Sequence, residues 1–137
     1  MPEDDRLPRW LGVTTVAALT TDATVLDGAA CRTRAGLYAE WARVLHFPDH
    51  FGHNWDAFAD SLRDTLPVTG TTLVLSDAGQ LLVDEAPAQL GTLLAILDEV
   101  AAADPSFRVV LQTAPVGAAD LVRRLSRGSR SPSSGPG

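Results

Sequence analysis

The sequence predicts a single α/β domain in which about four helices pack on a small three-stranded parallel sheet. The chain has 137 residues, a length that suits one hydrophobic core. Its apolar segments alternate between strand-like runs and helix-like stripes, in the order strand, helix, helix, strand, helix, strand. Because strands separated by helices rejoin the same sheet through right-handed crossovers, this alternation favours parallel pairing.

The three expected strands are short and rich in β-branched or aliphatic residues. The first covers residues 24–26 and stops at an Asp-Gly dipeptide, which is typical of turns. Residues 71–76 form a nearly continuous apolar run, which suits a parallel strand covered on both faces, and residues 107–111 form the last strand. Residues 10–19 stay ambiguous, because a β-branched stretch there ends in helix formers.

Three longer helices and one short helical turn are also expected. They cover residues 33–45, 54–64, 78–83 and 87–102. Thr33 is a suitable N-cap for the first helix, and Pro48 ends it because the residue before a proline avoids the helical region. Asn54 or Asp49 caps the second helix, and Pro87 lies in the first turn of the last one.

The two ends of the chain are expected to lie outside this domain. Residues 1–21 form an N-terminal extension that is partly ordered, residues 22–113 form the domain, and residues 114–137 form a basic C-terminal tail. Residues 112–122 are weakly helical at best. After residue 126 the tail consists of Ser, Gly, Pro and Arg with nothing apolar to bury, so we expect it to be largely disordered.

Charge is distributed unevenly along the chain. The formal net charge is −6, yet residues 22–111 carry 13 acidic and 5 basic residues, whereas residues 121–137 carry four arginines and no acid. An acidic body repels nucleic acid and attracts basic proteins, so we expect no direct nucleic-acid binding by the folded domain. For the arginine tail, contact with RNA or an acidic surface and a plain solubilising role both stay open.

The sequence also bears on location and assembly. Three of the first five residues are acidic, unlike the basic start of a signal peptide, and the longest apolar runs fall far short of the roughly 20 residues that span a bilayer. The single cysteine, Cys31, excludes an intramolecular disulfide and fits a reducing compartment. We expect a cytoplasmic protein without membrane contact, monomeric when free, with export by an unusual route left open.

The second expected helix carries Asp56, Asp60 and Asp64 at a spacing of four residues. One helical turn separates neighbours, so all three share one face. The opposite, apolar stripe consists of Trp55, Phe58, Ala59 and Leu62. Each neighbouring like-charge pair costs about 0.2–0.5 kcal/mol, and no base follows at the same spacing. This pattern predicts a surface for a cationic partner, against the ordinary alternative of a solvated helix face.

Two kinds of chemistry have little support. The histidines His46, His50 and His53 lie within eight residues, and histidines beside carboxylates bind zinc in other proteins. Their spacing crosses a proline and a glycine, however, and H-E-x-x-H is absent, so we expect no metal. Cys31 lacks a flanking catalytic motif and no nucleotide-binding glycine loop occurs. We therefore expect no cofactor and no catalytic residue, and interpret the chain as a non-enzyme.

The segment around the acidic helix resembles the barstar family of ribonuclease inhibitors. The matching pattern is Phe47-Pro48-x-x-Phe51-Gly52-x-Asn54-Trp55-Asp56-Ala57-Phe58-x-Asp60-x-Leu62. The order of strands and helices is similar over about residues 24–111. The resemblance implies a barstar-like sheet of three parallel strands packed by helices. It also implies that the acidic helix and the loop before it fill the active site of a ribonuclease.

The resemblance also implies roles for particular residues. Asp60 matches the family's central position, where a carboxylate takes the place of a substrate phosphate, and Asp56 matches its neighbour one turn earlier. The partner-binding residues implied in this way are Asp60, Asp56, Asn54, His53, Phe51, His50 and Gly52.

The chain departs from the family pattern at four places. Where the family's namesake has an aromatic residue, a glutamate and a tryptophan, this chain has His50, His53 and Ala59. A further interface glutamate of the family has no clear counterpart here and falls near Gly91.

These observations lead to one functional interpretation and two alternatives. We interpret the chain as an inhibitor or immunity protein, of the antitoxin kind, that binds the active site of a basic, barnase-like ribonuclease through its acidic helix. The first alternative is a protein-interaction module of the same fold with a non-ribonuclease partner. The second is a metal-dependent enzyme that uses the three histidines, which stoichiometric metal in the purified protein would reveal.

Overall fold

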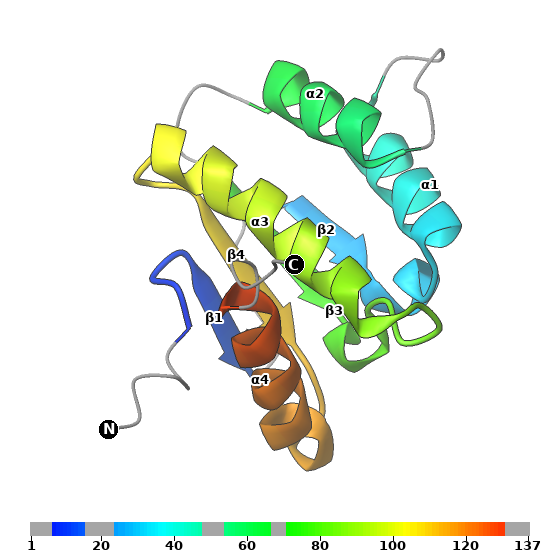
Figure 1. Ribbon diagram of the computed structural model, residues 1–137, viewed down its shortest axis with the longest axis vertical. Coiled ribbons are helices and arrows are strands. Elements are labelled where there is room, and N and C mark those ends of the chain that lie inside the picture. The colour runs from blue at the N-terminus through cyan, green and yellow to red at the C-terminus, as the bar shows by residue number, and fades with distance from the viewer. Residues whose placement is uncertain (1–6, 16–23, 48–53, 67–70, 131–137) are drawn as a thin grey trace.

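The computed structural model describes residues 7–15, 24–47, 54–66 and 71–130. The elements, in chain order, are β1 (Leu11–Thr14), β2 (Thr24–Asp27), the 3-10 turn η2 (Gly28–Cys31), α1 (Arg34–Leu45), α2 (Trp55–Thr65), β3 (Thr72–Ser76), the 3-10 turn η3 (Ala78–Gln80), α3 (Pro87–Ala103), β4 (Arg108–Gln112) and α4 (Pro115–Arg130). Figure 1 shows them in one view.

The sheet is parallel throughout and has the strand order β1-β4-β3-β2. The predicted α/β class is therefore confirmed, but the predicted number of three strands is wrong by one. The fourth strand, β1, comes from the ambiguous segment near the N-terminus. Leu11 pairs with Val109 in the parallel register, and its side chain is buried in the core. The helix formers that follow, which made the pattern ambiguous, fall outside the described residues.

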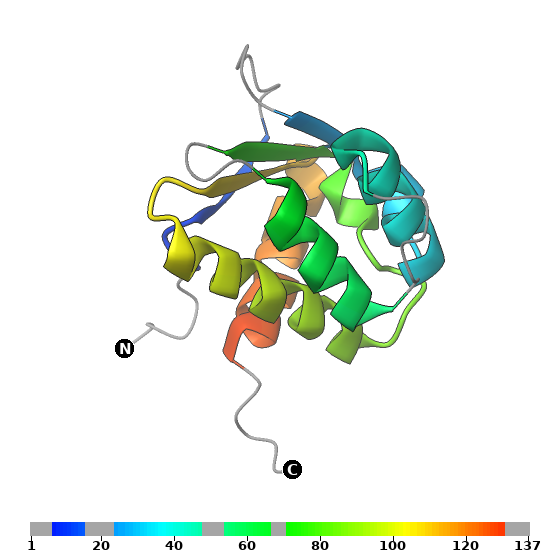
Figure 2. The same ribbon diagram turned by 90° about the horizontal axis from the view of Figure 1, so that it is seen from above.

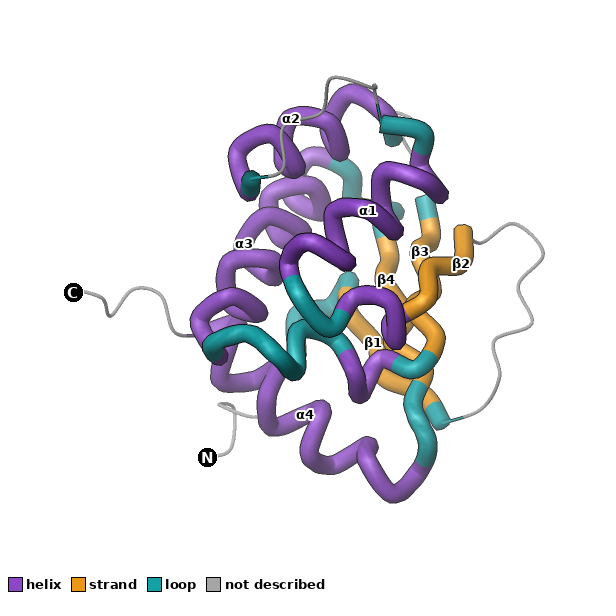
Figure 3. Tube along the Cα trace, turned by 90° about the vertical axis from the view of Figure 1, so that its right-hand side faces the viewer, coloured by secondary structure: helices purple, strands orange, loops and turns teal. Residues whose placement is uncertain are grey.

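The helices gather on one face of the sheet, as two views at right angles show (Figures 2 and 3). Alternate strand residues that point to this face are buried in the core, including Leu26, Leu73 and Leu75. All three central residues of β3 are buried, as the continuous apolar run predicts. The other face of the sheet is less uniformly covered. On that face, Val25 of the edge strand β2 is exposed to solvent.

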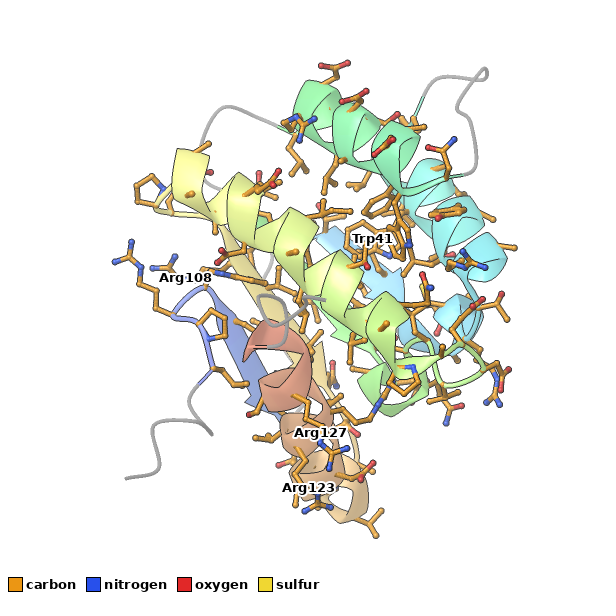
Figure 4. All side chains as sticks on the ribbon, in the orientation of Figure 1. Trp41, Arg108, Arg123 and Arg127 are labelled. Carbon is orange, nitrogen blue, oxygen red and sulfur yellow. The ribbon has the colours of Figure 1, made fainter. Side chains whose placement is uncertain are left out.

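A cluster of aromatic rings fixes α2 against α1. Phe58 of α2 is fully buried at the centre of this cluster, with Trp41 at a centroid distance of 5.2 Å. Tyr38 and Phe47 each lie at 6.0 Å from Phe58, and Trp55 lies at 5.6 Å. These separations fall within the range in which edge-to-face contacts add to the stabilisation from burial. Trp41 reaches into the interior from α1 (Figure 4).

A buried carboxylate connects α1 to the sheet. Glu40 is 7% exposed and accepts hydrogen bonds from the backbone N–H of Asp27 at 2.9 Å and from Nη2 of Arg43 at 2.8 Å. Burial by itself raises the pKa of Glu40, but the two hydrogen bonds and the charge of Arg43 outweigh it, so the pKa is lower than in a solvated glutamate. The ionised carboxylate is thus the form that the fold stabilises.

Helix α4 corrects the expectation for the C-terminal segment. Residues 112–122 were expected to be weakly helical at best, yet a continuous helix runs from Pro115 to Arg130. It packs against α3, η3 and β1, and Leu121 and Leu125 are fully buried. These two leucines are one turn apart, so a helix is the conformation that places both on the core. The predicted division into extension, domain and tail stays a prediction.

No helix among the described residues is both long enough and apolar enough to cross a membrane.

Replacing Leu121 or Leu125 by alanine is expected to lower the free energy of unfolding by about 2–5 kcal/mol, because each leaves a cavity in a packed core. Urea unfolding measures this loss. Val116→Ala is the matched control on the same helix, since Val116 is 93% exposed and its truncation should change stability little. Equal, negligible effects at all three positions would mean that α4 is not part of the core.

The Glu40 hydrogen bonds are expected to make stability depend on pH. Because the pKa of Glu40 is lower in the folded state, its contribution is complete above the unfolded pKa of about 4.3 and is lost as pH falls through the folded pKa. Glu40→Gln should cost about 1–2 kcal/mol at pH 7 and should lose less stability than wild type on acidification to pH 3. Urea unfolding midpoints of wild type and Glu40→Gln at pH 7 and pH 3 test both expectations. If the two proteins lose equal stability on acidification, Glu40 is not the source of the pH dependence.

Candidate functional site

Helix α2 presents an acidic face to solvent. Asp56, Asp60 and Asp64 are all exposed, and the side chain of Asp60 is 73% exposed. The opposite side of the helix is buried through Phe58 and Leu62, which are both fully inaccessible. The aromatic cluster thus determines which way the three aspartates point, as the sequence spacing predicts.

The start of α2 is fixed by a side-chain cap. Asn54 has an extended backbone conformation, and its Oδ1 accepts a hydrogen bond from the backbone N–H of Ala57 at 2.8 Å. Asp56 lies in the first helical turn, where the macrodipole favours a negative charge. Of the two caps considered from the sequence, Asn54 is the residue that occupies the N-cap position.

The acidic face contains an ion pair that the fourfold spacing in the sequence does not reveal. Arg63, three residues on, donates from Nη2 to Oδ1 of Asp60 at 2.7 Å. Its Nη1 lies 3.7 Å from Oε1 of Glu99 on α3. Across the part of the chain that the structure describes, Asp56 and Asp64 have no ion-pair partner. The carboxylate expected to be most important is therefore partly neutralised, and its neighbour one turn earlier is not.

A hollow of about 510 Å³ lies beside the start of α2. Its lining consists of Thr33, Arg34, Ala35, Tyr38, Asn54, Trp55 and Glu85. Within it, Nε of Arg34 lies 3.2 Å from Oε1 of Glu85, and burial raises the pKa of Tyr38. Sequence reasoning assigned no functional role to Arg34, Tyr38 or Glu85. No local pattern could have grouped them, because the α1 residues and Glu85 are about fifty positions apart and only the fold brings them together.

The indole of Trp55 connects α2 to α3. Its Nε1–H donates to Oε1 of Gln89 at 2.8 Å, and its ring meets that of Tyr38 edge-on at 5.5 Å. Gly91, near the expected position of the family's further interface glutamate, lines a different pocket that it shares with residues of α4. At the start of α2, the residue of α3 that contacts Trp55 is therefore Gln89, which has an amide side chain and not the carboxylate of a glutamate.

The structure places three of the seven expected partner-binding residues. Asn54, Asp56 and Asp60 lie together on the first two turns of α2 and its cap. The other four precede the helix and lie outside the described residues: His50, Phe51, Gly52 and His53. Their position relative to the acidic face stays a prediction.

The metal and nucleophile alternatives gain no support from this geometry. His46 is an exposed C-cap residue of α1 with a φ of 61°, and the other two histidines fall outside the described residues. No group of three metal-binding side chains occurs in the described ranges. Cys31 is fully buried, and its burial, followed by the charge of Glu40, raises the pKa of its thiol to about 12. A thiol with that pKa stays protonated at neutral pH and is a poor nucleophile.

Comparison with models of known protein families gives a match. A family model described as Barstar (barnase inhibitor) matches residues 21–112. The matched region covers more than half of the chain, from before β2 to the end of β4, and it contains the whole acidic face. Strand β1 and helix α4 lie outside it. No curated protein matches the chain.

Replacing the cap residue tests whether the start of α2 depends on it. Asn54→Ala should lower the free energy of unfolding by about 1 kcal/mol, because the N–H of Ala57 loses its acceptor. Asn54→Asp should retain most of the stability, since aspartate caps helices equally well. Urea unfolding of the two variants gives the comparison, and equal losses in both would show that the cap is not the cause.

Proposed function

The chain belongs to the barstar family, and from that premise we propose that it inhibits a basic ribonuclease by placing the acidic face of α2 in the enzyme's active site. The observation that carries the proposal is the pair Asp56 and Asp60, exposed one turn apart on a helix whose other side is fixed in the core. The chain then acts as a binding protein and not as an enzyme.

The chemistry of such a complex follows from what a ribonuclease must bind. An enzyme that cleaves RNA holds the phosphate with cationic side chains, and a carboxylate at the same position satisfies those cations through charge-assisted hydrogen bonds. Asp60 is the residue we assign to that position, with Asp56 one turn earlier as its neighbour. Because both are carried by a helix, little conformational entropy is lost on binding.

The ion pair between Asp60 and Arg63 is compatible with this role. Both side chains are well exposed, at 73% and 49%, and exposed pairs of this kind contribute only about 0–1 kcal/mol. Several cations in an active site outweigh that contribution. The free chain thus keeps its central carboxylate paired, and the enzyme replaces Arg63 as the partner of Asp60.

The net charge supports the choice of partner. With a formal charge of −6, the chain attracts a basic protein at long range and repels RNA. We propose that the chain is monomeric before it binds, and that it acts in the cytoplasm as an immunity protein or antitoxin against a ribonuclease made by the same cell. The partner-binding surface then includes Asn54 and the preceding residues 50–53.

Alanine substitutions along α2 test the assignment of the acidic face. Against a panel of small basic ribonucleases of the barnase kind, we expect wild type to inhibit RNA cleavage by at least one enzyme. Asp60→Ala should weaken binding by roughly 30-fold or more, because losing one member of a buried charge pair costs about 2–5 kcal/mol, and Asp56→Ala should weaken it less. Asp64→Ala is the matched control, with the same change of charge one turn further on.

The outcomes separate the alternatives. If Asp60→Ala and Asp64→Ala have equal effects on the dissociation rate, the acidic face acts only through its net charge and the assignment is wrong. If no ribonuclease is inhibited but a basic protein without nuclease activity binds in an Asp60-dependent way, the chain is an interaction module of the same fold. Circular dichroism and urea unfolding of each variant establish that the fold is intact.

Salt is expected to act mainly on the association rate. Raising ionic strength from about 0.01 M to 0.15 M shortens the screening length from roughly 30 Å to 8 Å, so long-range attraction by the acidic face is largely removed. Surface plasmon resonance should show a steep fall in the association rate and a much smaller change in the dissociation rate. An association rate that does not depend on salt would contradict electrostatic steering by α2.

A further inference from the structure

A second pocket lies away from the acidic face of α2, between the start of α3, the segment before it, and α4. Its volume is about 450 Å³, within the range of about 300–1,000 Å³ that is typical of small-molecule sites. The lining residues from α3 and the preceding segment are mainly apolar: Leu82, Val83, Pro87, Ala88, Leu90 and Gly91. Leu82 and Leu90 are buried beneath it, and Val83 is 40% exposed.

Two arginines of α4 line the same pocket. Arg124 is partly buried, and its Nη2 donates to the backbone carbonyl of Leu81 at 2.7 Å. Arg127 is exposed and also lines the pocket. Figure 4 shows its side chain on α4. Within the described part of the chain neither guanidinium has a carboxylate at ion-pair distance. Asp120, the nearest acid in sequence, forms its ion pair with Arg123. Burial lowers the pKa of Arg124, and the charge of Asp120 opposes this shift only in part.

The acidic residue among the described lining residues does not neutralise these arginines. Glu85 accepts the backbone N–H of Arg34 at 2.8 Å through Oε2, and its Oε1 lies 3.2 Å from Nε of the same arginine. Both carboxylate oxygens are therefore engaged by the start of α1. The pocket keeps an excess of positive charge.

The start of α3 adds to this positive potential. Its first residue is Pro87, and Ala86 at the N-cap has no side chain that could accept a hydrogen bond from the first turn. The first turn contains no acidic residue. The helix thus supplies no acid and no side-chain cap of its own at the end that lines the pocket, and its dipole favours an anion there.

We infer that this pocket binds a small organic acid, with its carboxylate held by Arg124 and Arg127 near the first turn of α3 and its apolar body on Leu82, Val83 and Leu90. A guanidinium matches the geometry of a carboxylate, and the apolar floor selects against small, fully hydrated anions. The site is separate from the acidic face of α2, so it stands whether or not the chain inhibits a ribonuclease.

Octanoate is a suitable probe for this site, because it joins one carboxylate to a flexible apolar chain. Titrated into the ¹⁵N-labelled full chain, it should shift amide signals of residues 82–91 and of α4 in a saturable way. Octan-1-ol has the apolar chain without the charge, and acetate has the charge without the chain. Each should bind at least about tenfold more weakly than octanoate, because each loses one of the two kinds of contact.

Substitutions on α4 complete the test. Arg127→Gln should weaken octanoate binding by about fivefold, as expected for loss of a partly exposed ion pair, and it should leave the fold intact because Arg127 is exposed. Arg123→Gln is the matched control on the same helix, since Arg123 pairs with Asp120 and does not line the pocket.

Three results would overturn the inference. The first is equal binding of octan-1-ol and octanoate, which would leave an apolar groove without anion recognition. The second is an equal effect of Arg127→Gln and Arg123→Gln, which would assign the effect to net charge. The third is the absence of saturable shifts in residues 82–91.

Discussion

The packing of Phe58 against the rings around it is the interaction on which the proposed interface depends. Phe58 faces inward from α2, and the rings of Trp41, Tyr38, Phe47 and Trp55 surround it. Because a helix has only one rotational setting that buries this side chain, the same contacts determine that Asp56 and Asp60 face solvent. One face of α2 thus packs in the core, and the opposite face carries the residues proposed to bind a partner. A substitution among the aromatic rings around Phe58 would rotate or loosen the acidic face even though its aspartates are unchanged.

Much of this arrangement could be predicted from local pattern. Apolar spacing correctly gave the positions of the main helices and of β2, β3 and β4, and the fourfold aspartate spacing correctly gave a single exposed face. Local pattern failed where tertiary contacts decide the structure. β1 is short and flanked by helix formers, so only its pairing with β4 identifies it as a strand. Helix α4 contains four arginines and two glycines, and the burial of Leu121 and Leu125 against distant elements is what stabilises it.

The candidate site shows the same division. The Asn54 cap and the aspartate face are features of one segment and could be read from it, whereas the contacts from other elements could not. Glu99 lies near Arg63, Gln89 accepts from Trp55, and Glu85 meets Arg34 only because the fold joins α3 and its preceding segment to α1 and α2. The organic-acid pocket is an extreme case, since α4 lies outside the region that the family model matches, and both arginines of the proposed site come from it.

The hydrogen bond from Trp55 to Gln89 has a practical consequence. The chain has three tryptophans, and Trp10 and Trp41 are almost fully shielded from solvent, whereas Trp55 is half-buried at the first position of α2. Indole emission responds to changes in polarity and hydrogen bonding around the ring. The intrinsic fluorescence of the unlabelled chain therefore contains one component that originates beside the acidic face, and a partner docking there would register in it without any engineered dye.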